Sequence, residues 1–152
     1  MRAAKKRILF VEQSMDGTVG GSHTCLLDML ANLDRERFEP LVLLHEANPL
    51  LSQFESLAET LVIPPRDAWH LISKLHGISV GPPAVAPMLL QKALNVVRVP
   101  LGSVMRWRRI LARHRIDLVH MNNTVFRVGE WVLAARMTGT RIACHQRGFG
   151  SS

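Results

Sequence analysis

The sequence predicts an α/β domain built on a Rossmann-like, doubly wound parallel sheet of about five strands. Short apolar runs alternate with amphipathic helical segments, and loops with glycine or proline separate them. Of the 152 residues, 47% are hydrophobic and 20% are charged, a balance typical of a soluble folded domain. Strands that alternate with helices form parallel sheets, and right-handed crossovers then favour the doubly wound topology.

The first half of the chain contains three predicted strands. Residues 7–12 form an apolar run that ends in a glycine-bearing loop, residues 16–21, and leucines at helical spacing follow it. Residues 40–45 are a second buried strand, residues 49–57 a helix that begins at a proline, and residues 61–63 a third strand. This alternation predicts two successive crossover units.

The second half begins with an irregular segment. Residues 64–87 are rich in glycine and proline, which predicts a long excursion across the surface. Two helices are expected next, at residues 88–97 and 103–115, separated by Pro100 and Gly102. A strand at 116–120, a helix at 127–137 and a strand at 141–145 complete the pattern. We therefore expect a single domain over residues 1–152, with a basic, partly helical insertion at about 64–115.

The formal net charge of +7 is concentrated in one block. Residues 68–116 contain eight basic residues and no acidic one, whereas residues 1–67 have a net charge of −3 and residues 117–152 of +2. Such a block attracts phosphates of nucleic acid, of anionic lipids or of a nucleotide substrate. Nucleic acid is disfavoured, because the block has no interleaved stacking aromatics and no recognisable DNA-binding motif.

The second basic helix has two stripes at helical spacing. The apolar stripe consists of Val104, Trp107 and Leu111, and the basic stripe consists of Arg106, Arg109 and Arg113. This pattern is typical of a helix on an anionic membrane surface, with the three arginines in contact with lipid phosphates. It is more commonly the pattern of a solvated basic helix whose apolar stripe packs on its own domain.

The compartment is predicted from three features. Cys25 and Cys144 lie in neither a C-x-x-C spacing nor a Cys/His cluster, so we expect buried thiols in a reducing compartment and no metal site. The basic start is followed by an apolar run too short for a signal peptide. The stretch 75–91 is too short and too rich in proline to span a bilayer. A cytoplasmic protein with peripheral contact at the inner face of the membrane is expected.

Ligands of doubly wound sheets bind outside the carboxyl ends of the strands, which directs attention to three loops. In the first, Gly20 and Gly21 precede a helix, where missing β-carbons and free amides favour a phosphate or carboxylate. A tight turn at a helix start would have the same sequence. Neither G-x-G-x-x-G nor a P-loop occurs. Glu12 and Asp16 are also expected near this edge, where one of the two carboxylates could act as a general base.

The other two loops follow the last two predicted strands. Asn122, Asn123 and the neighbouring Thr124 could bind sugar hydroxyls, and His120 could transfer protons or hydrogen-bond within the fold. His145 ends the last strand, and Arg147 is suited to a phosphate or carboxylate. No catalytic residue is assigned. The remaining histidines indicate only structural or surface roles: His23, His45, His70, His76 and His114.

Several of these motifs occur together in a known family. The opening of residues 5–11, Gly20-Gly21-Ser22, residues 116–120, and residues 135–139 leading to His145 resemble the N-terminal domain of family 4-type GT-B glycosyltransferases over about residues 6–149. The resemblance implies one half of a GT-B fold, in which two Rossmann-like domains face each other. The N-terminal domain mainly receives the acceptor, and the C-terminal domain holds most of the nucleotide-sugar.

The resemblance also implies roles for individual residues. Gly20 and Gly21 match the glycine-rich loop that approaches the donor phosphates and the reacting sugar. Asn122 lies where many members have the second His of an H-x-H pattern, so no proton-transfer role is carried over to it. His145 matches the strand-end His that lines the cleft.

The expected function is the acceptor-binding half of a glycosyltransferase, which transfers a sugar from a nucleotide-sugar to a glycan or lipid-linked acceptor. The nucleotide-sugar is a co-substrate, and no cofactor is expected. No second domain with a donor-binding acidic motif follows, so we expect an isolated chain that is inactive without a separate donor-binding domain or subunit. The alternative is a non-catalytic membrane-surface adaptor or partner-recruiting domain. A small nucleotide-binding protein is disfavoured by the missing fingerprints.

Overall fold

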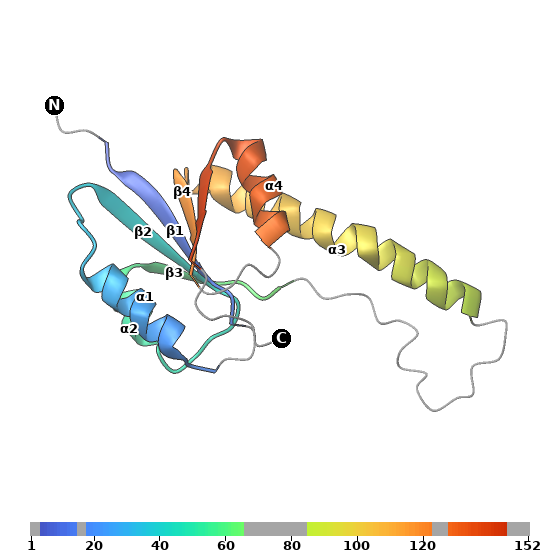
Figure 1. Cartoon of the computed structure of the whole chain (residues 1–152), viewed down its shortest axis with the longest axis horizontal. Coiled ribbons are helices and arrows are strands. Elements are labelled where there is room, and N and C mark those ends of the chain that lie inside the picture. Colours follow the sequence, from blue (N-terminus) through green and yellow to red (C-terminus); the bar gives the residue numbers. More distant parts are fainter. Residues whose placement is uncertain (1–3, 15–17, 66–84, 123–127, 146–152) are drawn as a thin grey trace.

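In the part of the chain that the structure describes, five parallel strands form one sheet in the order β3-β2-β1-β4-β5 (Figure 1). The computed structural model describes residues 4–14, 18–65, 85–122 and 128–145. The strands are β1 (Lys6–Glu12), β2 (Phe38–Leu44), β3 (Glu59–Val62), β4 (Leu118–Met121) and β5 (Arg141–Cys144). The helices are α1 (Gly21–Ala31), α2 (Leu51–Leu57), α3 (Val85–Arg113) and α4 (Val128–Thr138). The predicted Rossmann-like α/β fold is confirmed.

The helices form a layer on each face of the sheet, with α1 and α2 on one face and α3 and α4 on the other (Figure 1). Because side chains alternate along a strand, β1 contributes to both hydrophobic clusters. Ile8 and Phe10 pack with α1 and α2, whereas Leu9 and Val11 pack with α3 and α4. Burial on both faces explains why β1 reads as an uninterrupted apolar run.

The apolar stripe of the second basic segment belongs to the core. Val104, Trp107 and Leu111 are 6%, 3% and 1% exposed, and they pack against the sheet and α4. The indole rings of Trp107 and Trp131 stack with centroids 4.5 Å apart at an interplanar angle of 12°. Of the two interpretations that the sequence left open for this stripe, packing on the domain is therefore the one that the structure supports.

The two helices predicted at 88–97 and 103–115 are one continuous helix, α3, with Pro100 inside it. A proline removes one backbone hydrogen bond and disturbs the preceding turn, but turns on either side of it can continue the helix. The second half of α3 is held by its buried residues, and the first half extends beyond the sheet (Figure 1). The helix ends where Arg115 adopts a left-handed φ of 50° and the N–H of Ile116 bonds to the carbonyl of Leu111 (3.0 Å).

The two thiols are both free, but only one is even partly buried. Cys25 is half-buried, and Cys144 is exposed because β5 is the last strand at its edge of the described sheet. The expectation of two buried thiols is therefore wrong for Cys144. Within the described ranges, no helix combines the length and the apolar character needed to cross a bilayer.

Candidate functional site at the carboxyl edge of the sheet

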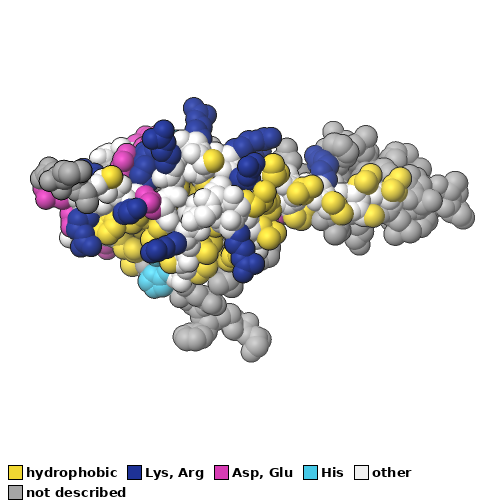
Figure 2. Space-filling model, turned by 90° about the horizontal axis from the view of Figure 1, so that it is seen from above, with side chains coloured by type: hydrophobic (Ala, Val, Ile, Leu, Met, Phe, Trp, Pro, Cys, Tyr) yellow, Lys and Arg dark blue, Asp and Glu magenta, His cyan; other side chains and the backbone are white. Residues whose placement is uncertain are grey.

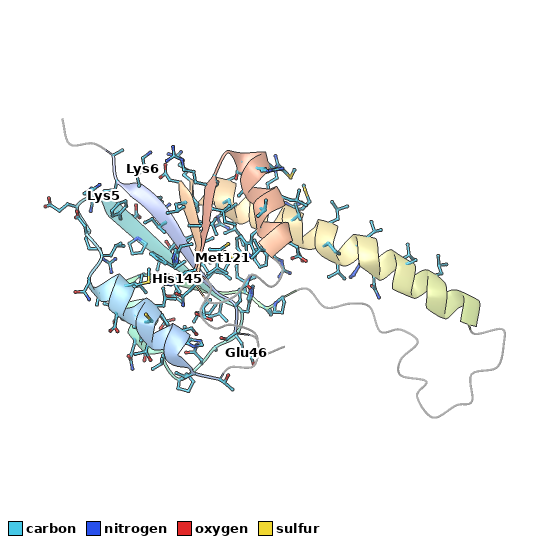
Figure 3. All side chains as sticks on the ribbon, in the orientation of Figure 1. Lys5, Lys6, Glu46, Met121 and His145 are labelled. Atoms are coloured by element: carbon cyan, nitrogen blue, oxygen red, sulfur yellow. The ribbon has the colours of Figure 1, made fainter. Side chains whose placement is uncertain are left out.

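The carboxyl ends of β1, β4 and β5 lie next to one another, and hydrogen bonds continue between the residues that follow them. The N–H of Asn122 bonds to the carbonyl of Val11 (2.9 Å), and the N–H of His145 bonds to the carbonyl of Met121 (2.8 Å). Figure 3 shows Met121 and His145 together where these strands end. The parallel register thus gathers the residues after three strands at one edge.

Asn122 is fully buried at this edge and connects three elements. Its Nδ2 donates to Oε2 of Glu12 (2.6 Å) at the end of β1, and to the carbonyl of Ser22 (2.9 Å) in the first turn of α1. Both amide hydrogens are therefore used within the protein, and Asn122 cannot donate them to a ligand. Among the described residues, its Oδ1 has no hydrogen-bond partner.

Glu12 is the other member of this network. Its side chain is 1% exposed, and its Oε1 accepts a hydrogen bond from the hydroxyl of Ser14 (3.1 Å). A buried carboxylate requires such partners, because its desolvation is costly. From the sequence, Glu12 was predicted only to be an acidic residue near the ligand edge. An acidic residue that ends an otherwise apolar buried strand is the signal that could have predicted its structural role.

The N-terminus of α1 lies at the same edge, beside Asn122. Gly20 is its N-cap residue, and the ring of His23, only 2% exposed, accepts a hydrogen bond at Nδ1 from the N–H of Gly20 (3.3 Å). The N–H of His23 bonds to the carbonyl of Gly20 (3.0 Å) in return. His23 therefore has the structural role that the sequence predicted for it.

Neither glycine at this helix start is required by the packing of the described residues. A β-carbon built on Gly20 or Gly21 meets no described atom within 4 Å. Gly20 has φ −128° and ψ −179°, an extended conformation that any residue adopts. Among the described residues, the absence of these side chains leaves open space next to the first-turn amides, where a helix N-terminus attracts anions.

Two histidines lie near each other at the same edge of the sheet. The ring centroids of His120 and His145 are 6.1 Å apart at an angle of 74°, and those of Phe10 and His120 are 5.3 Å apart. His120 is half-buried and His145 is exposed. An exposed imidazole next to a half-buried one can hydrogen-bond a hydroxyl of a ligand.

The remaining predicted site residues lie elsewhere. A cavity beside β3 is lined by Arg106, Arg109 and Arg113. It lies at the edge of the sheet opposite to the β5 edge. Asn123 and Arg147 are outside the described residues. The described part of the chain holds no group of three or more His, Cys, Asp or Glu side chains that could bind a metal ion.

No family model and no curated protein matches this sequence. Solved structures are similar to it at low identity. A glycosyltransferase from Rickettsia africae has a TM-score of 0.58 at 14% identity, over 93% of this chain and 30% of its own. HepE from Anabaena, in complex with UDP and glucose, has a TM-score of 0.51 at 21% identity, over 89% and 28%. The C-terminal domain of a hydrogenase from Pyrococcus furiosus has a TM-score of 0.52 at 12% identity, over 93% and 92%.

These similarities define the class of fold. The chain has the Rossmann-like α/β fold that forms each half of a GT-B glycosyltransferase, and it spans about 28% to 30% of the two glycosyltransferases. The similarity does not single out the N-terminal domain of the family 4 type, because neighbours at these identities share the fold alone.

Proposed function

We propose that this chain is the acceptor-side half of a glycosyltransferase that uses a nucleotide-sugar donor and a glycan or lipid-linked acceptor. In this proposal, residues 1–152 belong to one domain with an insertion at about 64–115. A donor-binding domain or subunit completes the site. The observation that supports it most is that the helix start at Gly20 and Gly21 and the pair His120 and His145 lie at the same edge of the sheet, on a fold shared with glycosyltransferases.

The chemistry of sugar transfer suits such a site. The enzyme positions two substrates and stabilises the negative charge that develops on the leaving diphosphate. First-turn amides of α1 can hydrogen-bond a phosphate oxygen, and the helix dipole favours the same charge. His145, which is exposed, can bind a sugar hydroxyl, while Glu12 and Asn122 hold the helix start and the strand end in place.

Titration with UDP, followed by amide chemical shifts, tests this proposal. We expect shifts at residues 20–23, 120–122 and 145, because these lie at the carboxyl edge of the sheet together with the helix start. Gly21→Leu places a side chain at a position where the β-carbon meets no described atom, so it should weaken the binding of UDP and leave the fold intact. Ala31→Leu, at the exposed far end of the same helix, is the matched control.

Two results would contradict the proposal. Shifts confined to other residues, or UDP binding that Gly21→Leu and Ala31→Leu leave equally strong, would remove the helix start as a phosphate site. Sustained sugar transfer by the purified 152-residue chain would show that no further domain is needed.

A second candidate function, a membrane-surface adaptor, is favoured by one observation. Four apolar side chains are 51% to 64% exposed along one stripe of α3: Leu90, Leu94, Val97 and Leu101. Figure 2 shows hydrophobic side chains along this projecting part of the helix. The helix contains six basic residues and no acidic one, so its surface favours an anionic bilayer.

Co-sedimentation with phosphatidylcholine vesicles, with and without phosphatidylserine, tests the adaptor. Leu94→Ser with Val97→Ser should abolish binding to the anionic vesicles. Leu133→Ser, at an exposed leucine of α4, should leave it unchanged. Equal binding of both variants would refute the adaptor and leave the glycosyltransferase proposal untouched.

A further inference from the structure

A cavity of about 460 Å³ lies along the edge of the sheet, between β3 and the second half of α3. Its walls include Arg106, Arg109 and Arg113, together with the apolar side chains of Leu61, Ile63 and Ile110. The three arginines are spaced three and four residues apart, so they lie on one face of the helix. Strands β2 and β1 separate this cavity from the ends of β4 and β5.

The positive charge of this cavity is not neutralised by the described residues. None of the three guanidinium groups forms an ion pair within the described ranges, and no carboxylate lines the cavity. Glu59 is near its end, 3.9 Å from both Nδ1 of His114 and the Arg7 guanidinium. That carboxylate therefore already has the Arg7 guanidinium as a cationic neighbour outside the arginine row.

Arg106 is held in place at the mouth of the cavity. Its Nη1 donates to the carbonyl of Pro64 (2.7 Å), and its guanidinium carbon lies 6.0 Å from the centroid of the buried Trp107 ring. A guanidinium has five N–H donors, so four remain for a ligand. Arg109 and Arg113 are exposed and can turn towards the same ligand.

We propose that this cavity binds a phosphate group on a molecule that also has an apolar part. Rows of arginines bind phosphate through pairs of charge-assisted hydrogen bonds, which makes phosphate a better match than a carboxylate of lower charge. The apolar floor of Leu61, Ile63 and Ile110 accepts the hydrocarbon next to the phosphate. The volume is in the range of small-ligand sites.

This site is independent of the proposed sugar transfer, because it shares no residue with the carboxyl edge of β1, β4 and β5. Two sources supply the same ligand chemistry: the headgroup of a membrane phospholipid, and a soluble phosphorylated amphiphile. Both present a phosphate next to an aliphatic chain, and an experiment separates them.

The test uses short-chain phosphatidic acid below its micellar concentration, and phosphatidylcholine vesicles that contain long-chain phosphatidic acid. Arg109→Gln with Arg113→Gln removes two exposed charges from the cavity. Arg108→Gln with Arg136→Gln removes two exposed charges that do not line it and is the matched control. We expect the cavity variant to lose about tenfold in affinity or more, and the control to change less than about twofold.

Each outcome decides the proposal. Loss of binding to the soluble lipid in the cavity variant alone, with displacement by inorganic phosphate, supports a site that also takes soluble ligands. Cavity-dependent binding to vesicles alone supports a lipid headgroup at a membrane surface. No binding to either probe would overturn the proposal. Equal losses of affinity in the two variants would also overturn it, because binding would then depend on the overall positive charge and not on the cavity.

Discussion

Replacing Asn122 by alanine should destabilise the protein by about 3 kcal/mol. The substitution removes a hydrogen bond to the buried carboxylate of Glu12 and another to the carbonyl of Ser22. A hydrogen bond to a charged group contributes about 1.5 to 3 kcal/mol, and one between neutral groups about 1 kcal/mol. Little is regained by solvation, because the site is fully buried.

Urea unfolding followed by circular dichroism measures this loss. We expect the midpoint to fall with the slope unchanged, and the melting temperature to fall by about 10 °C. Asn32→Ala is the control, because the Asn32 amide also donates to a backbone carbonyl, that of Asp28 (2.9 Å), but is exposed. A loss below about 1 kcal/mol for Asn122→Ala, or a loss no greater than that of Asn32→Ala, would refute the role of Asn122 as the link between three elements.

Three further predictions concern the core, the edge opposite the site and α3. Trp131→Ala should cost about 3 to 5 kcal/mol in urea unfolding, because it removes the buried ring stacked on Trp107; a smaller loss would mean that the two helices repack. The carboxylate of Asp117 accepts a hydrogen bond from the Lys6 ammonium and another from the backbone N–H of Arg7. These bonds lower the pKa of Asp117 below 3.8. Asp117→Asn should therefore lower the free energy of unfolding by less than about 1 kcal/mol at pH 7, since solvent screens this ion pair. The difference between wild type and variant should vanish as the pH falls below 3.8, because the carboxylate is then protonated. A difference that stays constant with pH would contradict the ionic origin. Pro100→Ala restores a helical hydrogen bond and removes the clash of the proline ring with the preceding turn, a total gain of up to about 3 kcal/mol, and should slow amide exchange in the first half of α3. Unchanged exchange would show that the proline does not limit this helix.

The strands were predictable from the sequence because each is an apolar run bounded by turn residues. All five predicted strands agree with the structure to within two residues at each end. The error at Pro100 has a physical reason: a local helix breaker was weighed without the tertiary contacts that hold Val104 and Trp107 in the core. Local signals predict where a regular element is favoured, and packing decides whether it continues.

The common edge of the candidate residues could be predicted from the sequence, but their contacts could not. Parallel strands place Gly21, Asn122 and His145 at one edge, which follows from topology alone. The pairing of Asn122 with Glu12 spans 110 positions of sequence, and no local pattern indicates it. The cavity beside β3 was missed for a similar reason, because the apolar side chains of Leu61 and Ile63 meet the arginines of α3 only in the folded chain.

The central place of β1 in the sheet has a consequence for biosynthesis. One flank of β1 pairs with β2 early, but the other flank pairs with β4, which leaves the ribosome only after more than a hundred further residues. Until then the nascent chain presents an apolar strand with an open edge, the kind of segment that associates with other chains. Released fragments that end before residue 118 should therefore aggregate more readily than the chain that includes β4 and β5.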